Sequence, residues 1–398
     1  MQESPLNQSF KLPCGVVIPN RIAKSAMSEG IAEPNGRPTT ALFNLYERWG
    51  KGGAGILYTG NVMVDSAHLV NANVMIAEEE NFLAEYTTLA EKAQAHGSHL
   101  WMQINHPGRQ TPADLDKAPV SASNVGMPNK KYLQPRPLEE AEILDLIERY
   151  GNSALLAKKA GMKGAQIHGA HGYLVNQFLS PLTNLRTDQW GGSLENRSRF
   201  LMEIYRNMRA KVGPGFPLGI KINSADFQRG AFTEEESMTV IQMLDEAGMD
   251  LIEVSGGTYE RAAMMGTQKE STKKREAYFM EFIVKVSNKI TTPLMLTGGF
   301  RTVDTMNKAI SNGELDFVGI GRPFCIFPDV AKDLMSGAMT DCSVPDLLTG
   351  VEKIDMSGML QTPWNMVQLA RMGQGLEPDL NLDIWTVFEK VTGLKRPA

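Results

Sequence analysis

The stretch LGIKINSADFQRGAFTEEESMTVIQMLDEAGMDLIEVSG, residues 218–256, contains the pattern that decides the fold. A short apolar run, LGIKIN, is followed by an amphipathic segment over 234–248 and then by a second apolar run, LIEVSG. Thr233 and Glu236 have the spacing of a capping box, and Gly248 supplies the left-handed residue that commonly ends a helix. Strands joined by a helix pair in parallel, so the stretch predicts a β-α-β unit.

The same alternation of short apolar runs and amphipathic segments recurs along the chain. Further helices are expected over 83–97, 139–161 and 195–213, and the last two also end in Gly. The expected strands are 21–27, 55–64, 99–106, 164–170, 218–223, 251–256, 294–299 and 317–322. These repeats show no break in composition, so they predict one closed (β/α)8 TIM barrel of the α/β class rather than an open sheet.

Segments at the two ends of the chain fall outside these repeats. Residues 3–18 are predicted to form a small hairpin that closes the bottom of the barrel. We expect residues 1–340 to form the barrel domain and residues 341–398 to form a helical extension packed on it. The long connections 106–138 and 171–192 should gather at the C-terminal ends of the strands, where barrel active sites lie.

Composition argues against several classes of protein. The chain is 42% hydrophobic and 21% charged with a net charge of −5, which is typical of a soluble enzyme and not of a nucleic-acid-binding protein. No apolar run approaches the roughly 18 residues of a membrane span, and the N-terminus does not resemble a secretory signal. Cys14, Cys325 and Cys342 form no C-x-x-C, so we expect reduced thiols in a cytoplasmic protein.

A G-x-G-x-x-G pattern at Gly50, Gly52 and Gly55 does not indicate a nucleotide-binding Rossmann domain. That fingerprint must follow a strand and open a helix. Here it follows a predicted helix and opens a predicted strand, so it reads as a helix end and a turn.

Two histidines and a tyrosine, His168, His171 and Tyr173, follow one predicted strand closely. The spacing of the histidines is compatible with metal binding, although no carboxylate lies beside them. Two neutral imidazoles can instead donate hydrogen bonds to a carbonyl oxygen and stabilise negative charge that develops on it. Tyr173, on the outgoing loop, could then supply a proton.

Charged residues and glycines mark the ends of other strands. Lys221 points into the barrel, where it needs an anionic partner, either a bound electron-rich ring or a structural ion pair with a neighbouring strand. Glycines beside arginines at the ends of the last two strands match the phosphate site of this barrel class, although they could simply turn the chain. These residues are Gly298, Gly299, Arg301, Gly321 and Arg322.

These motifs together resemble the Old Yellow Enzyme family of FMN-dependent ene-reductases, which are single TIM barrels. The segment IHGAHGYLVNQFLSPLTNLRTDQWGGSLENRSRF closely resembles the signature of that family. NRIAKSAMSE and MQINHPGRQ resemble its first and third strand motifs, and LTGGFRT and GIGRPF resemble its phosphate-binding ends. The resemblance runs from about Pro19 to Phe324.

The resemblance implies a bound FMN and a set of flavin contacts. Gln103 would hydrogen-bond the pyrimidine ring, and Lys221 near N1/O2 would favour the anionic reduced flavin. The implied flavin contacts are Ser25, Ala26, Met27, Ser28, Gly60, Asn61, Gln103 and Lys221, and the implied phosphate contacts are Gly298, Gly299, Arg301, Gly321 and Arg322.

The resemblance also implies the catalytic roles and the reaction. His168 and His171 would bind the substrate carbonyl oxygen, Tyr173 would protonate the α-carbon, and Arg109 would contact substrate or flavin. NADPH or NADH would reduce FMN, which would then reduce an enone or nitroalkene in a ping-pong cycle. The rivals are a metal-dependent barrel lyase or hydrolase that uses the two histidines as ligands, and a non-catalytic flavin-binding protein.

Four positions depart from the usual pattern of the family. Ala26 stands where Pro is usual, and Ser28 replaces a Thr or Cys that tunes the flavin potential. Asn61 stands where a Gly or Ala is usual, and Lys221 replaces Arg. The expected partners are small molecules rather than nucleic acid or membranes, and the sequence is compatible with an oligomer.

Overall fold

A closed barrel of eight strands forms the centre of the molecule, and every neighbouring pair of strands is parallel. The computed structural model describes residues 4–78, 80–116, 118–258, 276–355, 360–392 and 395–396. In barrel order the strands are β3 (Ile22–Lys24), β4 (Ile56–Met63), β5 (His99–Asn105), β8 (Gly164–Gly169), β9 (Leu218–Asn223), β10 (Leu251–Ser255), β11 (Leu294–Thr297) and β12 (Phe317–Ile320). The predicted barrel and its eight predicted strands are confirmed.

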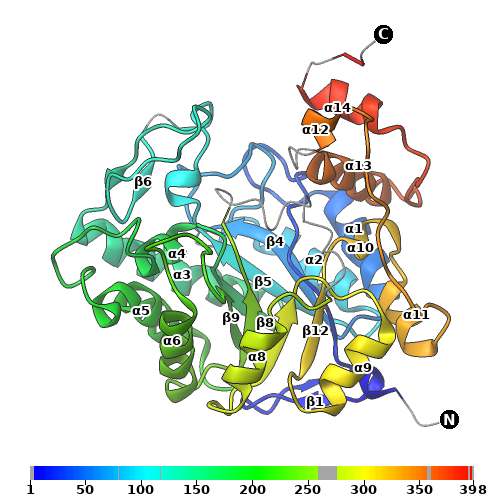
Figure 1. Cartoon of the computed structure of the whole chain (residues 1–398), viewed down its shortest axis with the longest axis horizontal. Coiled ribbons are helices and arrows are strands. Elements are labelled where there is room, and N and C mark those ends of the chain that lie inside the picture. The colour runs from blue at the N-terminus through cyan, green and yellow to red at the C-terminus, as the bar shows by residue number, and fades with distance from the viewer. Residues whose placement is uncertain are drawn as a thin grey trace.

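Helices follow the strands and surround the barrel (Figure 1). The main helices are α1 (Thr40–Lys51), α2 (Leu83–Gln94), α3 (Glu140–Lys159), α5 (Leu194–Val212), α6 (Glu234–Glu246), α8 (Met280–Ser287), α9 (Val303–Ser311) and α11 (Val330–Ser336), and the short ones are η1 (Pro5–Asn7), η2 (Gly108–Gln110), α4 (Leu174–Leu179) and α10 (Pro323–Ile326). The predicted capping box of α6 is present, and Gly248 has the expected positive φ of 85°. Gly52 caps the end of α1 just before β4, which confirms that the glycine-rich pattern is a helix end and a turn.

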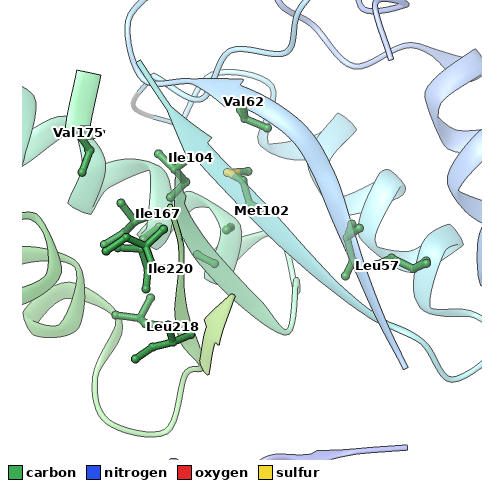
Figure 2. Close-up of a cluster of buried hydrophobic side chains, with 14 of the residues drawn as sticks. Leu57, Val62, Met102, Ile104, Ile167, Val175, Leu218 and Ile220 are labelled. Atoms are coloured by element: carbon green, nitrogen blue, oxygen red, sulfur yellow. The ribbon is translucent and has the colours of Figure 1, made fainter. Parts of the chain in front are cut away.

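The outward-facing side chains of the barrel strands form most of the core. Ile104, Ile167 and Ile220 are register neighbours on β5, β8 and β9, and all three are completely buried. Figure 2 shows them side by side, with Val175 of α4 close to them. Burial of each such side chain stabilises the fold by about 2 kcal/mol, so this layer holds the helices against the barrel.

The bottom of the barrel is filled by apolar side chains and closed by the predicted hairpin. Strands β1 (Phe10–Lys11) and β2 (Val17–Ile18) pair in antiparallel orientation. Leu12 and Ile18 from this hairpin pack on Trp101 and other inward-facing side chains of the barrel. This plug leaves the opposite end, at the C-terminal ends of the strands, as the place for a binding site.

The described residues of the C-terminal segment form three helices, and the segment packs beside α1 (Figure 1). They are α12 (Glu352–Asp355), α13 (Gln361–Gly373) and α14 (Ile384–Thr392). Asn44 of α1 donates a hydrogen bond to the carbonyl of Gly373 at 3.1 Å. A Cβ on Gly373 would lie 2.8 Å from the carbonyl oxygen of Ala41, so only Gly allows this close approach. A helical tail is confirmed, and its division from the barrel as a second domain stays a prediction.

The long loop after β5 contains a further small sheet, in which β6 (Val120–Ser121) pairs with β7 (Arg136–Pro137). In the described part of the chain, no helix combines the length and the apolar character needed to cross a membrane.

Candidate active site

A cavity of about 520 Å³ opens at the C-terminal ends of the barrel strands. Its volume lies within the range of small-molecule and cofactor sites. Residues from strand ends all around the barrel line it, as do residues of the C-terminal segment. Of the predicted site residues, the cavity is lined by Ser25, Ala26, Met27, Ser28, Asn61, Gln103, His168, His171, Tyr173, Lys221, Gly298, Gly299, Arg301, Gly321 and Arg322.

The two histidines and the tyrosine form one cluster on the cavity wall. The ring centre of His168 lies 5.2 Å from that of His171 and 4.8 Å from that of Tyr173, edge to face in both pairs. His171 has a φ of 65°, which is unusual for a residue with a Cβ and is typical of functional sites. Its ring Nε2 lies 2.9 Å from the hydroxyl of Ser255, which holds the imidazole in place.

Both imidazoles are uncharged near neutral pH. Burial, reinforced by the positive charge of Lys221, lowers the pKa of His168 and of His171 well below the usual 6.5. The backbone N–H of Ala170 donates to Nδ1 of His168 at 3.4 Å, so the ring proton of the neutral form resides on Nε2. His168 can therefore donate one hydrogen bond from Nε2 to a bound ligand.

Lys221 makes the structural ion pair that the sequence left open as an alternative. Its Nζ lies 2.9 Å from Oε1 of Glu253, and both side chains are buried. Glu253 is its register neighbour on the adjacent strand β10. Lys221 also lines the cavity, so the ion pair and a contact with a ligand are compatible.

Ser28 and Asn61, two of the positions that depart from the family pattern, are in contact. The hydroxyl of Ser28 donates to Oδ1 of Asn61 at 3.2 Å across the cavity wall. Gly60 lies behind that wall, where its N–H donates to Glu29 at 2.7 Å. A Cβ at this position would lie 2.6 Å from the backbone carbonyl oxygen of Met27, so Gly60 is required here by close packing.

Gln103 presents a carboxamide at the floor of the cavity. Its Nε2 donates to Oε1 of Gln166 at 2.8 Å, and its backbone N–H donates to the hydroxyl of Thr59 at 2.8 Å. Gln166 thus holds the side chain and Thr59 holds the backbone, as expected for a residue that orients a ligand.

The predicted phosphate end of the cavity contains both arginines. Gly298 and Gly299 have φ values of 136° and 88°, so these positions also turn the chain. The ring of Tyr278, just before α8, packs closely there: a Cβ on Gly299 would lie 2.9 Å from it. Nη1 of Arg322 donates to Oε1 of Gln361 at 2.5 Å, so helix α13 fixes this guanidinium.

Arg109 lies outside this cavity and lines a small neighbouring pocket. Its Nη1 donates to the carbonyl of Gly126 at 3.1 Å, and only 5% of the residue is exposed. Its predicted contact with substrate or flavin stays a prediction. The segment 258–275, expected to cover the site, lies outside the described residues except for Thr258, which lines the same small pocket.

Helix α13 of the C-terminal segment contributes a wall that the sequence did not predict. Thr362, Asn365 and Met366 line the cavity although they follow the barrel strands by some 40 residues. No local motif marks them, since they lie on an ordinary amphipathic helix. Cys325 and Cys342 also line the cavity as free thiols, and burial raises the pKa of each to about 12, which makes them unreactive.

Asp65, His68 and His106 make up the single group of three potential metal ligands in the described ranges. The N–H of Gly108 donates to Nδ1 of His106 at 3.0 Å, so Nε2 carries the ring proton and points to Asp65 at 3.7 Å. Nη1 of Arg149 lies 3.9 Å from the same carboxylate. A protonated nitrogen is not a metal ligand and the guanidinium repels cations, so we interpret the group as a polar anchor for the loop after β5. Within the group, Nδ1 of His68 is hydrogen-bonded to Oδ2 of Asp65 at 2.6 Å.

Comparison with known proteins identifies relatives of the whole barrel. The model of the NADH:flavin oxidoreductase / NADH oxidase family matches residues 10–341. The NADH-dependent flavin oxidoreductase iliE of Hypocrea jecorina (strain QM6a) is 37% identical over 363 residues, which are 84% of this chain and 90% of that protein. The NADH-dependent flavin oxidoreductase nadA of Aspergillus parasiticus is 38% identical over 345 residues, which are 82% of this chain and 77% of that protein.

Solved structures give the same picture of the fold. A 2-naphthoyl-CoA reductase in complex with 2-naphthoyl-CoA has a TM-score of 0.82 and 25% identity, covering 93% of this chain and 57% of that one. An Old Yellow Enzyme homologue from Zymomonas mobilis has a TM-score of 0.73 and 22% identity, covering 91% of this chain and 98% of that one. The predicted resemblance, the enzyme class of oxidoreductase, and the cofactors FMN and NADH or NADPH are confirmed.

Proposed function

Because this chain belongs to the NADH:flavin oxidoreductase / NADH oxidase family, we propose that it reduces the activated C=C bond of α,β-unsaturated carbonyl compounds or nitroalkenes with NADPH or NADH. The observation that carries the proposal is the cluster of His168, His171 and Tyr173 on the wall of the cavity. Two neutral imidazoles beside a phenol suit an acceptor that needs its oxygen held and its carbon protonated.

The residues around the cavity fit an FMN molecule. Arg301 and Arg322 lie at the end that adjoins Gly298 and Gly299, where backbone and guanidinium groups can bind a phosphate. A Cβ on Gly319, lower on β12, would lie 1.9 Å from Oγ1 of Thr297, so the strands are packed too closely there for any side chain. The polar floor of the cavity next to Gly319 can bind the heteroatoms of a flavin ring.

The floor supplies both a cation and a carboxamide. Lys221 and Gln103 face the cavity from β9 and β5. An ammonium and a carboxamide together match a ring edge that carries carbonyl oxygens and an N–H group. We assign these two residues to the pyrimidine edge of the flavin.

FMN supplies the hydride chemistry when it is bound, because it takes a hydride from the nicotinamide and gives it to the acceptor. The protein binds and orients the acceptor. His168 donates its Nε2 proton in a hydrogen bond to the acceptor oxygen, while Ser255 holds His171 beside it. Negative charge that develops on the oxygen is stabilised there in a site shielded from water, where His168 is only 4% exposed.

Tyr173 holds the proton that the α-carbon receives. Its ring packs against that of His168, and the residue is only 5% exposed. A buried phenol at the cavity wall can deliver a proton from the side on which it lies, which gives the product a defined configuration. Solvent then restores the proton on Tyr173.

The experiment that tests the proposal is product analysis after turnover of 2-cyclohexen-1-one with NADPH in D₂O. The proposal predicts cyclohexanone with one deuterium at the α-carbon and protium from NADPH at the β-carbon. It also predicts that a chelator does not reduce the rate of turnover. Recovery of unchanged enone would contradict an ene-reductase, and sensitivity to the chelator would favour a metal enzyme.

A further inference from the structure

A charged pair lies buried inside the barrel, directly below the cavity that it borders. Glu253 is completely buried and Lys221 is 3% exposed, and their charged atoms lie 2.9 Å apart. Charges buried in this way are unfavourable unless they are paired and hydrogen-bonded. The apolar plug of the barrel bottom lies beneath Lys221 and Glu253. The charge and the hydrogen bonds of the pair therefore act on the cavity above.

Glu253 is the centre of a hydrogen-bond network rather than one half of an isolated ion pair. Besides Lys221, the hydroxyl of Thr297 donates to its Oε1 at 2.6 Å. The carboxamide Nε2 of Gln166 donates to its Oε2 at 2.7 Å. Three donors from three different strands thus converge on one carboxylate, which can only accept.

Because the carboxylate only accepts, it fixes the direction of the hydrogen bonds on the side of Gln166. Gln166 must turn its NH₂ to Glu253, which leaves its carbonyl oxygen to accept from Nε2 of Gln103 at 2.8 Å. Gln103 must therefore turn its own carbonyl oxygen away from Gln166. The floor of the cavity offers a hydrogen-bond acceptor there, suited to an N–H group of the bound ring.

Glu253 also fixes the direction of the hydroxyl hydrogen bonds on the other side, at Thr297 and Ser25. Thr297 has one proton and donates it to Glu253, so in its 2.7 Å contact with Ser25 it must accept. Ser25 is then the donor, and its oxygen lone pairs remain for the cavity that it lines. One buried carboxylate thus sets the hydrogen-bonding polarity of residues on two sides of the floor.

We propose that Glu253 is a positioning residue that sets both the charge and the hydrogen-bond polarity of the cavity floor, and through them the reduction potential of bound FMN. The inference rests on the proposed function, because it takes FMN as the ligand. Glu253 offsets the positive charge of Lys221 and so limits how strongly this cation favours the electron-rich reduced state of the cofactor. Through Gln166 it also keeps Gln103 in the orientation that binds a ring N–H.

A purely structural ion pair would stabilise the barrel but leave the cofactor unaffected. The two roles therefore differ in the midpoint potential of bound FMN, measured on the holoenzyme with redox dyes. Glu253→Gln keeps the shape of the side chain and removes its charge, and Lys221→Gln removes the opposite charge. Glu235→Gln neutralises an exposed carboxylate on α6 and is the matched control.

We expect Glu253→Gln to raise the ratio of reduced to oxidised FMN at least tenfold at a fixed ambient potential, which is about 30 mV for a two-electron couple. Lys221→Gln should shift the potential in the opposite direction, and Glu235→Gln should not shift it. Gln166→Met removes the hydrogen bonds that link Glu253 to Gln103 without changing any charge. It should therefore weaken FMN binding severalfold and shift the potential less than Glu253→Gln does.

The double variant Glu253→Gln/Lys221→Gln keeps the test decisive if an unpaired buried charge prevents one single variant from folding. We expect its potential to lie above that of Lys221→Gln and close to that of the unmodified enzyme. The inference is overturned if Glu253→Gln behaves like the control, or if the double variant has the same potential as Lys221→Gln. If the unmodified chain does not bind FMN at all, the proposed function fails, whereas a bound flavin that is insensitive to Glu253 contradicts this inference alone.

Discussion

His168→Ala removes the hydrogen-bond donor that the proposed mechanism needs most. Burial, together with His171 and Lys221, lowers the pKa of His168 well below its usual value, so the ring is a neutral donor at pH 7. Since Ala170 donates to Nδ1 at 3.4 Å, only Nε2 can donate to the acceptor oxygen. Loss of one such donor in a site shielded from water raises the barrier by about 3 kcal/mol, which is a factor of about 10² in rate.

The assay is stopped-flow oxidation of the pre-reduced enzyme by 2-cyclohexen-1-one. We expect His168→Ala to slow this step about 10²-fold. Oxidation of the same enzyme by molecular oxygen needs no hydrogen bond to a carbonyl group, so its rate should change much less and serves as an internal control. His168→Gln, which retains an N–H donor, should recover part of the loss.

If the substitution slowed oxidation by the enone and by oxygen equally, it would disturb the cofactor rather than the binding of the acceptor. An unchanged rate with the enone would refute the reasoning entirely. His106→Gln is a further control, because this histidine is equally buried but its contacts lie with the loop after β5.

Three further predictions concern other residues. Tyr173→Phe should slow oxidation by enones at least 10²-fold but leave flavin reduction by NADPH within about threefold, as the loss of one general acid would do; equal slowing of both half-reactions in stopped-flow traces would remove the assignment. Gln361→Ala should free the guanidinium of Arg322, whose Nη1 donates to Oε1 of Gln361 at 2.5 Å. It should weaken FMN binding to the apoprotein about tenfold in a fluorescence titration, because a hydrogen bond to a charged group contributes about 1.5–3 kcal/mol. An unchanged dissociation constant would show that α13 does not support the phosphate end. Burial lowers the pKa of His106 to about 4, so below pH ~6.5 the unfolded chain takes up a proton that the folded protein does not. This contribution to stability is complete above pH ~6.5 and is lost as the pH falls, by about 2 kcal/mol between pH 7 and 5. Urea unfolding of His106→Gln should therefore depend less steeply on pH, and an identical pH dependence would contradict the assignment.

The barrel was predictable from sequence because its signals are local and repeated. Runs such as LGIKIN and LIEVSG are short, apolar and separated by capped helices, and all eight expected strands are present. Helix α4 was not predicted, because its six residues lie within a long polar connection and are too few to show a periodic pattern. The sequence also does not reveal the two-residue strands β6 and β7, whose pairing depends on contacts across the loop after β5.

The candidate site was predictable where its residues end strands or belong to a motif. His168, His171 and Tyr173 follow one strand, and the structure brings them together on the cavity wall. Glu253 was not singled out, because it lies within an apolar run and its role depends on partners from three other strands.

Residues of the tail were missed for a related reason. Asn365 reaches the cavity because α13 packs beside α1, a contact that joins distant parts of the chain. The link between Ser28 and Asn61 likewise required the structure, although each position was unusual by itself. Tertiary contacts of this kind leave no signal in one sequence, whereas strand ends and motifs do.

The most direct test of the proposed enzyme is an anaerobic titration of the purified protein with NADPH, followed through the visible absorption of the flavin. We predict a yellow protein that is bleached by one equivalent of NADPH per bound FMN and regains its colour when 2-cyclohexen-1-one is added. A protein that is colourless after loading with FMN, or that is bleached by NADPH but not restored by the enone, would contradict the account.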